Sequence, residues 1–221
     1  MRREIDIEKI SDGKRYGIHD MVKADCQDCK GCSACCKGMG ESIVLDPLDI
    51  WNLKRGTGMS FQELMNTYIE LNVVDHIILP NLKMNNDSGQ CSFLDDNGRC
   101  SIHPYRPGIC RIFPLGRIYE DESFQYFLQI NECTKTNRTK IKVSKWIDCS
   151  QVKENQLFIS SWHYFLKKVE HLIVESDEED AMKNVSMYLL NQFYVKDMID
   201  AEGFYQEMLE RIAYVEEGLG L

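Results

Sequence analysis

The cysteines of this chain are the residues whose type and spacing point most directly to chemistry. Ten occur in 221 residues, and four of them form the pattern Cys29-x2-Cys32-x2-Cys35-Cys36. The spacers in this tract are small or polar, so the thiols have almost no apolar neighbours with which to build a core. Thiolate is the soft, anionic ligand that zinc and iron–sulfur clusters prefer. The tract therefore predicts a metal or cluster site.

The two adjacent cysteines add a constraint on that site. Because neighbouring side chains diverge, Cys35 and Cys36 cannot easily bind one tetrahedral ion. They more naturally serve two ions, one multinuclear centre, or one ligand position and a second role. The doubled cysteine thus favours more than one metal.

A second reading of the same tract is an iron–sulfur cluster run. The spacing Cys26-x2-Cys29-x2-Cys32-x3-Cys36 is that of a bacterial ferredoxin run, although Lys37 stands where that run has proline. No second run of this type occurs in the sequence, and overlapping registers arise easily where cysteines are dense. Spacing alone therefore permits a cluster without requiring one.

The cysteine tract and two later segments together resemble a known family. The later segments are Cys91 with Cys100, and the run Ile102-His-Pro-Tyr-Arg106-Pro107-Gly-Ile-Cys110-Arg111-Ile-Phe-Pro114. This combination is similar to the YkgJ-type family with the CxxCxxCC motif, which is described as chelating zinc or iron and is related to flagellin lysine N-methylase. The resemblance covers roughly residues 26–135, and it implies a bound metal rather than a particular reaction.

The resemblance also implies a set of ligands. Cys26 and Cys149 lie outside the family pattern. His103 follows Cys100 at a ligand-like spacing, but similar proteins often carry tyrosine there, which favours a hydrogen-bonding or packing role for His103. The implied metal ligands are Cys29, Cys32, Cys35, Cys36, Cys91, Cys100, Cys110 and Cys133.

Two arginines flank one of these ligands. Arg106 and Arg111 bracket Cys110 in sequence. Four thiolates around a divalent ion leave a net charge of about −2, which a partly buried site must offset. We therefore expect both arginines to support the bound metal centre, with ordinary salt bridges to carboxylates as the alternative.

Three functions follow from these residues. The leading hypothesis is a protein that holds iron, as an iron–sulfur cluster or a multinuclear centre, with redox or protein-modification chemistry. The first alternative is an interaction module with structural zinc, because zinc bound only by thiolates has no open position for catalysis. The second alternative is a lysine N-methylase-like enzyme, which rests on resemblance alone. Catalytic residues stay unassigned, since nucleotide-binding and hydrolase motifs are absent from the sequence.

Net charge and hydropathy limit which partners and which cellular compartment we expect. A formal net charge of −9 argues against nucleic acid, which is bound through Lys and Arg. No stretch approaches the roughly 20 apolar residues of a membrane span, and the first residues do not read as a secretory signal. We expect a cytoplasmic protein with reduced thiols and an unidentified protein partner or substrate. A secreted protein with a disulfide framework is the alternative.

The surrounding pattern predicts an α+β fold: an irregular cysteine-rich metal-binding core with short strands, followed by a three-helix C-terminal region. We divide the chain into an N-terminal extension (1–25), a cysteine-cluster domain (26–150) and a C-terminal helical region (151–221). Apolar residues at helical spacing predict the last three helices within 158–173, 181–189 and 204–215.

Local signals predict the elements that carry the cysteines. Asp46-Pro47 resembles a helix start, with an end near 56–58, and the capping box Ser60 to Glu63 opens a helix over 60–72. Asn97-Gly98 suits a tight turn, which would bring Cys91 and Cys100 close together. Short strands are expected at 43–45, 73–79 and 124–130.

Overall fold

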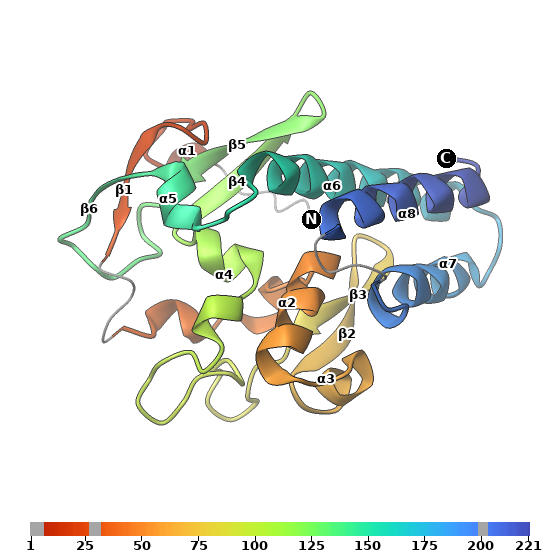
Figure 1. Cartoon of the computed structure of the whole chain (residues 1–221), viewed down its shortest axis with the longest axis horizontal. Helices are drawn as coiled ribbons and strands as arrows, with labels where there is room; N and C mark the ends of the chain where they lie inside the picture. The colour runs from red at the N-terminus through yellow and green to blue at the C-terminus, as the bar shows by residue number, and fades with distance from the viewer. Residues whose placement is uncertain (1–6, 27–31, 199–202) are drawn as a thin grey trace.

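The computed structural model describes residues 7–26, 32–198 and 203–221, and it has the predicted α+β architecture (Figure 1). The C-terminal part contains the three predicted helices, α6 (Val152–Glu175), α7 (Ala181–Leu190) and α8 (Phe204–Leu219). A π-helical turn, Asn191–Val195, continues α7. The cysteine-rich part is built instead from short helical turns, which are η1 (Ala34–Cys36), η2 (Gly40–Ser42), η3 (His103–Tyr105) and α4 (Gly108–Ile112).

The strands of the described residues form three separate two-stranded antiparallel sheets. These pair β1 (Met21–Asp25) with β6 (Thr139–Lys142), β2 (Ile69–Val74) with β3 (Ile77–Leu82), and β4 (Leu115–Glu120) with β5 (Ser123–Leu128). The strand predicted at 124–130 is thereby confirmed as β5. Two further short helices are α1 (Ile7–Ile10) and α5 (Val143–Ile147).

The predicted helix starts are confirmed in both α2 (Pro47–Thr57) and α3 (Phe61–Thr67). In α2 the Asp46 carboxylate accepts a 2.8 Å hydrogen bond from the Asp49 backbone N–H, which satisfies one of the free donors at the helix start. The prediction that α3 runs to residue 72 is wrong. The helix stops at Thr67 because the chain from Ile69 onward pairs with β3.

The single strand predicted at 73–79 is also wrong, because a turn interrupts it. Asp75 and His76 have φ angles of 48° and 63°, and they join β2 to β3 in a tight hairpin. The strand predicted at 43–45 is reduced to one bridge, Val44 to Asn81, beside β3. The pairing of β3 with β2 and with Val44 thus explains why the strands predicted at 73–79 and 43–45 do not form as expected.

The helical region is held together by aromatic side chains. Figure 1 shows α6 and α8 lying side by side, and α7 packs against β3. The rings of Trp162 and Phe193 lie 4.9 Å apart, and those of Phe158 and Phe204 lie 5.6 Å apart. Buried residues from Val22 to Val215 form one hydrophobic cluster, which connects these helices to the cysteine-rich part.

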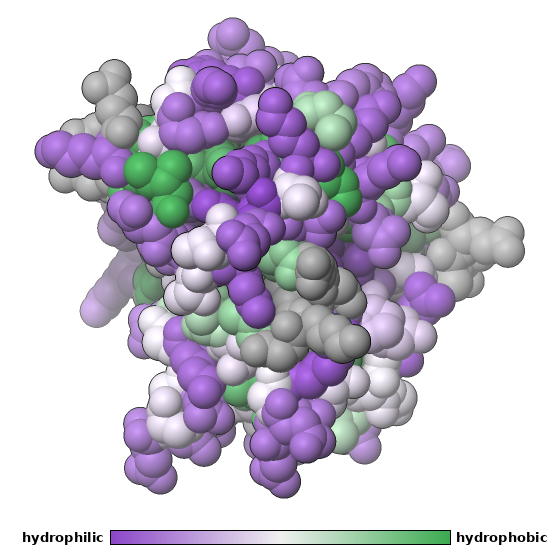
Figure 2. All heavy atoms as spheres, turned by 90° about the vertical axis from the view of Figure 1, so that its left-hand side faces the viewer, coloured by the Kyte–Doolittle hydropathy of each residue, from purple (hydrophilic) through white to green (hydrophobic). Residues whose placement is uncertain are grey.

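The surface is mixed in character. On the face at the left of Figure 1, hydrophobic side chains are scattered among hydrophilic ones (Figure 2). None of the helices in the described ranges has both the length and the apolar character needed to cross a bilayer.

Candidate metal centre

Six of the predicted cysteine ligands line one cavity of about 80 Å³, which we call the thiol cavity. Apolar side chains such as Ile43, Leu82 and Phe93 form much of the remaining wall. No disulfide joins any two of the nine cysteines that the structure describes. The six cysteines that line the thiol cavity are Cys32, Cys35, Cys36, Cys91, Cys100 and Cys110.

Backbone pairing brings the first two segments of this wall together. The Cys91 N–H donates a 2.8 Å hydrogen bond to the Cys36 carbonyl, and the Gly38 N–H donates one of the same length to Gly89. The chain that leaves the cysteine tract therefore runs beside the chain that leaves β3. This pairing places Cys36 next to Cys91, although 55 residues separate them in sequence.

The predicted turn at Asn97-Gly98 supplies the next ligand position. Gly98 has a φ of 71°, and beyond the turn a bridge joins Leu94 to Cys100. The expectation that this turn brings Cys91 and Cys100 together is confirmed, because both line the thiol cavity.

Cys110 comes from α4, whose position is fixed at both ends. At its start the Gly108 N–H donates a 2.7 Å hydrogen bond to the Asp49 carboxylate of α2. At its end the Trp146 indole N–H of α5 donates a 3.0 Å bond to the Ile112 carbonyl. Contacts from α2 and α5 therefore anchor the short helix that carries Cys110.

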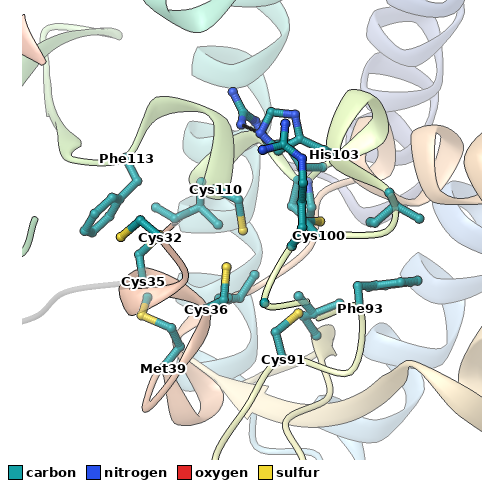
Figure 3. A pocket seen from close by; sticks show the side chains of 18 residues that line it. Cys32, Cys35, Cys36, Met39, Cys91, Phe93, Cys100, His103, Cys110 and Phe113 are labelled. Atoms are coloured by element: carbon teal, nitrogen blue, oxygen red, sulfur yellow. Dashed lines mark hydrogen bonds between the residues drawn. The ribbon is translucent and has the colours of Figure 1, made fainter. Parts of the chain in front are cut away.

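Four of the six thiols gather at the centre of the cavity, and we call them the inner thiols: Cys36, Cys91, Cys100 and Cys110. Figure 3 shows the Cys36, Cys91 and Cys110 thiols pointing toward a common space from different segments. Burial raises the pKa of Cys91 to about 11 and also raises the pKa values of Cys100 and Cys110. A metal ion that binds here must therefore displace thiol protons.

Cys36 differs from the other inner thiols. A hydrogen bond from Cys35 lowers the pKa of Cys36 to about 7, and the positive charges of Arg106 and Lys37 act in the same direction. The adjacent cysteines thus differ in role in this structure, because the Cys35 thiol donates a hydrogen bond to Cys36.

A second, smaller cavity of about 10 Å³ lies against the first. Cys32 and Cys35 line both cavities, and Cys133 lines only the smaller one. Cys26 also lines it, although the family pattern does not include Cys26; the ferredoxin-like register was the signal that could have included it. We call these four the outer thiols: Cys26, Cys32, Cys35 and Cys133.

The remaining predicted ligand, Cys29, lies outside the described residues. Within those residues, no three His, Cys, Asp or Glu side chains are already arranged as the ligand set of one metal ion. Binding would therefore have to draw the thiols together from the positions that they occupy.

The two predicted arginines occupy different places. Arg106 lines the thiol cavity, and its guanidinium is hydrogen-bonded to Nε2 of His103, which lines the same cavity. Arg111 points elsewhere, since it donates to the carbonyls of Pro104 (2.8 Å) and Asp148 (3.4 Å). Arg106 is thus the arginine positioned to offset thiolate charge.

Comparison with known proteins identifies a family that covers this part of the chain. A family model named CxxCxxCC, with the description "Putative zinc- or iron-chelating domain", matches residues 28–139, which is half of the chain. The comparisons with curated proteins and with solved structures found no match. The matched range contains the six cysteines of the thiol cavity and Cys133. The chain therefore belongs to the CxxCxxCC family of zinc- or iron-chelating domains.

Proposed function

We propose that this protein binds iron through its clustered thiols, as an iron–sulfur cluster or another multinuclear centre. The observation that carries the proposal is the number of thiols around one cavity. Six cysteines line it, whereas one tetrahedral ion takes four ligands. The cavity of about 80 Å³ is also several times the roughly 10–15 Å³ that a single water-sized occupant needs. Ligand number and available volume both favour a centre of several atoms.

The chemistry of the wall suits such a centre. Thiolates are the usual ligands of iron–sulfur clusters, and the hydrogen bonds and charges around the sulfurs tune the reduction potential. Arg106 supplies positive charge in the wall beside these thiols, and apolar residues such as Phe93 form part of the same wall. A bound iron centre would supply electron transfer, while the chain's own residues hold the thiols and offset their charge.

Structural zinc is the second candidate, and the division of the thiols favours it. Four inner thiols match the complement of one closed zinc site, and the small cavity between the outer thiols has the volume of a single ion or water. Two zinc ions would use Cys35 and Cys36 separately, as the adjacent pair predicts.

Matched cysteine variants test the assignment. Cys110→Ser and Cys91→Ser should lose most of the bound metal, because each removes an inner thiol. Cys149→Ser is the control, since Cys149 is a half-buried cysteine that lines neither the thiol cavity nor the smaller cavity beside it. Metal content per chain is measured for each purified variant. Unchanged metal in both inner-thiol variants would refute the site.

Cys133→Ser separates one centre from two. If the inner thiols hold one centre and the outer thiols another, this variant loses only part of the metal. Loss of all metal would mean that the two groups of thiols hold a single centre.

A further inference from the structure

Arg106 also lines a larger cavity, of about 330 Å³, whose chemistry is different. Four arginines contribute to its wall: Arg55, Arg106, Arg111 and Arg117. We call it the arginine cavity. Its volume is at the low end of the roughly 300–1,000 Å³ typical of small-molecule sites. Four arginines around one cavity of this size call for negative charge.

The acidic residues of the wall do not supply all of that charge. Asp46 and Asp49 each accept a backbone hydrogen bond from the other at the start of α2, and Asp49 also accepts from Gly108. Burial raises the pKa of both carboxyls, and the charge of Asp46 raises the pKa of Asp49 further. The exposed Asp148 is the third acidic side chain in the wall. Positive charge therefore exceeds negative charge around the cavity.

Arg111 keeps its positive charge available for a ligand, and Arg117 has an N–H donor without a partner among the described residues. Arg111 donates to the backbone carbonyls of Pro104 and Asp148, which hold its guanidinium in place without neutralising it. The Nε atom of Arg117 is buried, and it has no hydrogen-bond partner in the part of the chain that the structure describes. A guanidinium presents paired N–H donors that match the oxygens of a carboxylate or a phosphate.

The rest of the wall suits an organic molecule. Trp51 and Phe204 contribute aromatic surface, and the Tyr205 hydroxyl accepts a 3.3 Å hydrogen bond from the Asn155 amide. The Cys149 thiol lies 3.9 Å from the same hydroxyl and also lines the cavity. The reactivity of the Cys149 thiol should therefore depend on what occupies the arginine cavity.

We propose that the arginine cavity binds a small organic anion that carries a carboxylate or phosphate group, with Arg111 donating to the anionic group. Because Arg106 also lines the thiol cavity, the bound anion lies directly beside the candidate metal centre. The proposal is independent of which metal the thiols hold. It gives the protein a ligand site next to its metal site.

The charge of the cavity can be tested with two alkylating reagents that differ only in charge. Cys149 is the sole cysteine of the tryptic peptide that covers residues 146–153, so its alkylation can be followed by mass spectrometry. Initial rates are measured with iodoacetate and with iodoacetamide, on the folded metal-loaded protein and on the chain in denaturant. The ratio of iodoacetate rate to iodoacetamide rate should be about tenfold higher in the folded protein, because nearby cations attract the anionic reagent. Equal ratios in the two states would overturn the proposal.

Variants and competing anions sharpen this test. Arg111→Gln should return the ratio to near the unfolded value, whereas Arg15→Gln, which removes an exposed arginine elsewhere, should leave it unchanged. If Arg111→Gln does not fold, competition on the wild-type protein decides. Malonate or inorganic phosphate should slow alkylation of Cys149, and neutral malonamide should not. The stronger protector of the two anions identifies carboxylate or phosphate, and protection by neither refutes the site.

Discussion

The cysteine-rich segment from Cys32 to Ile112 and the helices from Val152 to Leu219 lie in one molecule but are built on different principles. In the helices, rings such as those of Phe158 and Phe204 are fully or almost fully buried against one another. Around the thiol cavity, the chain consists of turns and short helices, and six cysteines line the cavity. Burial of apolar surface stabilises the first region. The second has polar thiols at its centre, so we expect it to depend on what those thiols bind.

Metal removal should give the largest effect, and it should be confined to one region. Structural zinc contributes an apparent ~10–16 kcal/mol to the folding free energy of zinc-finger peptides. Losing the metal should therefore unfold the chain locally around the thiol cavity. In hydrogen–deuterium exchange after chelation, amides of the two segments that line the thiol cavity, residues 32–42 and 91–112, should exchange at least about a hundredfold faster. Amides of residues 152–175 should change little. Equal acceleration in both regions would contradict the claim that only the cysteine-rich region depends on the metal.

Truncation of the aromatic core should produce the next largest effect, without regard to metal. Phe158 is 0% exposed, so Phe158→Ala should lower the free energy of unfolding by about 3–5 kcal/mol. Leu157→Ala is the matched control, because Leu157 is adjacent to Phe158 in the same helix but is 56% exposed. Urea denaturation measures both variants. A control variant as unstable as Phe158→Ala would contradict this view of the helices.

A smaller effect is expected where α2 contacts the wall of the thiol cavity. A methyl group at Gly56 would lie 2.7 Å from the ring of Tyr105, which belongs to η3 with His103. Gly56→Ala should therefore cost about 1–3 kcal/mol of stability and lower the metal content. Gly218→Ala meets only an ordinary 3.5 Å contact in α8 and should be neutral or slightly stabilising. Thermal melts and metal analysis of the two variants check this difference.

The smallest predicted effect is a pH dependence that belongs to the helical region. His163 of α6 stacks on Tyr119 with ring centroids 3.6 Å apart, and burial lowers the pKa of His163 to about 4. Between pH 6.5 and 4 the unfolded chain then binds more protons than the folded one, so stability falls as pH falls through this window. After allowance for partial exposure, the loss should be about 1 kcal/mol.

The His163 contribution is isolated by comparing metal-free wild type with His163→Phe in denaturation experiments between pH 4 and 7. The variant should lack the wild-type decrease. His171→Phe, at a side chain that is 71% exposed, should retain it. A decrease of the same size in all three proteins would rule out His163 as its source.

Local sequence signals predicted the elements whose causes are local. The capping residues Asp46 and Ser60 fixed the starts of α2 and α3, and helical spacing located α6, α7 and α8. The β2–β3 hairpin was missed because its turn is Asp75-His76 rather than a glycine-containing pair. Asp and His adopt positive φ only at some cost, and here the pairing of six residues on each side supports it.

The site shows the same division between local and tertiary causes. The Asn97-Gly98 turn was sufficient to bring Cys91 and Cys100 together. Cys36 joins them through backbone pairing with Cys91, and before the structure only the family resemblance grouped it with them. The outer position of Cys26 depends on the pairing of β1 with β6, which lies more than 110 residues later. No local sequence pattern predicts this pairing. The arginine cavity could not be predicted for a similar reason. Its wall combines α2, β4, the chain before α6 and the start of α8, which only the folded structure brings together.

The central claim is that the thiols hold an iron centre of several atoms, and elemental analysis tests it most directly. Protein purified without oxygen is assayed for iron, zinc and acid-labile sulfide per chain, together with its visible absorption spectrum. The account predicts coloured protein with more than one iron per chain, and with sulfide if the centre is an iron–sulfur cluster. Colourless protein with stoichiometric zinc and no iron would contradict it.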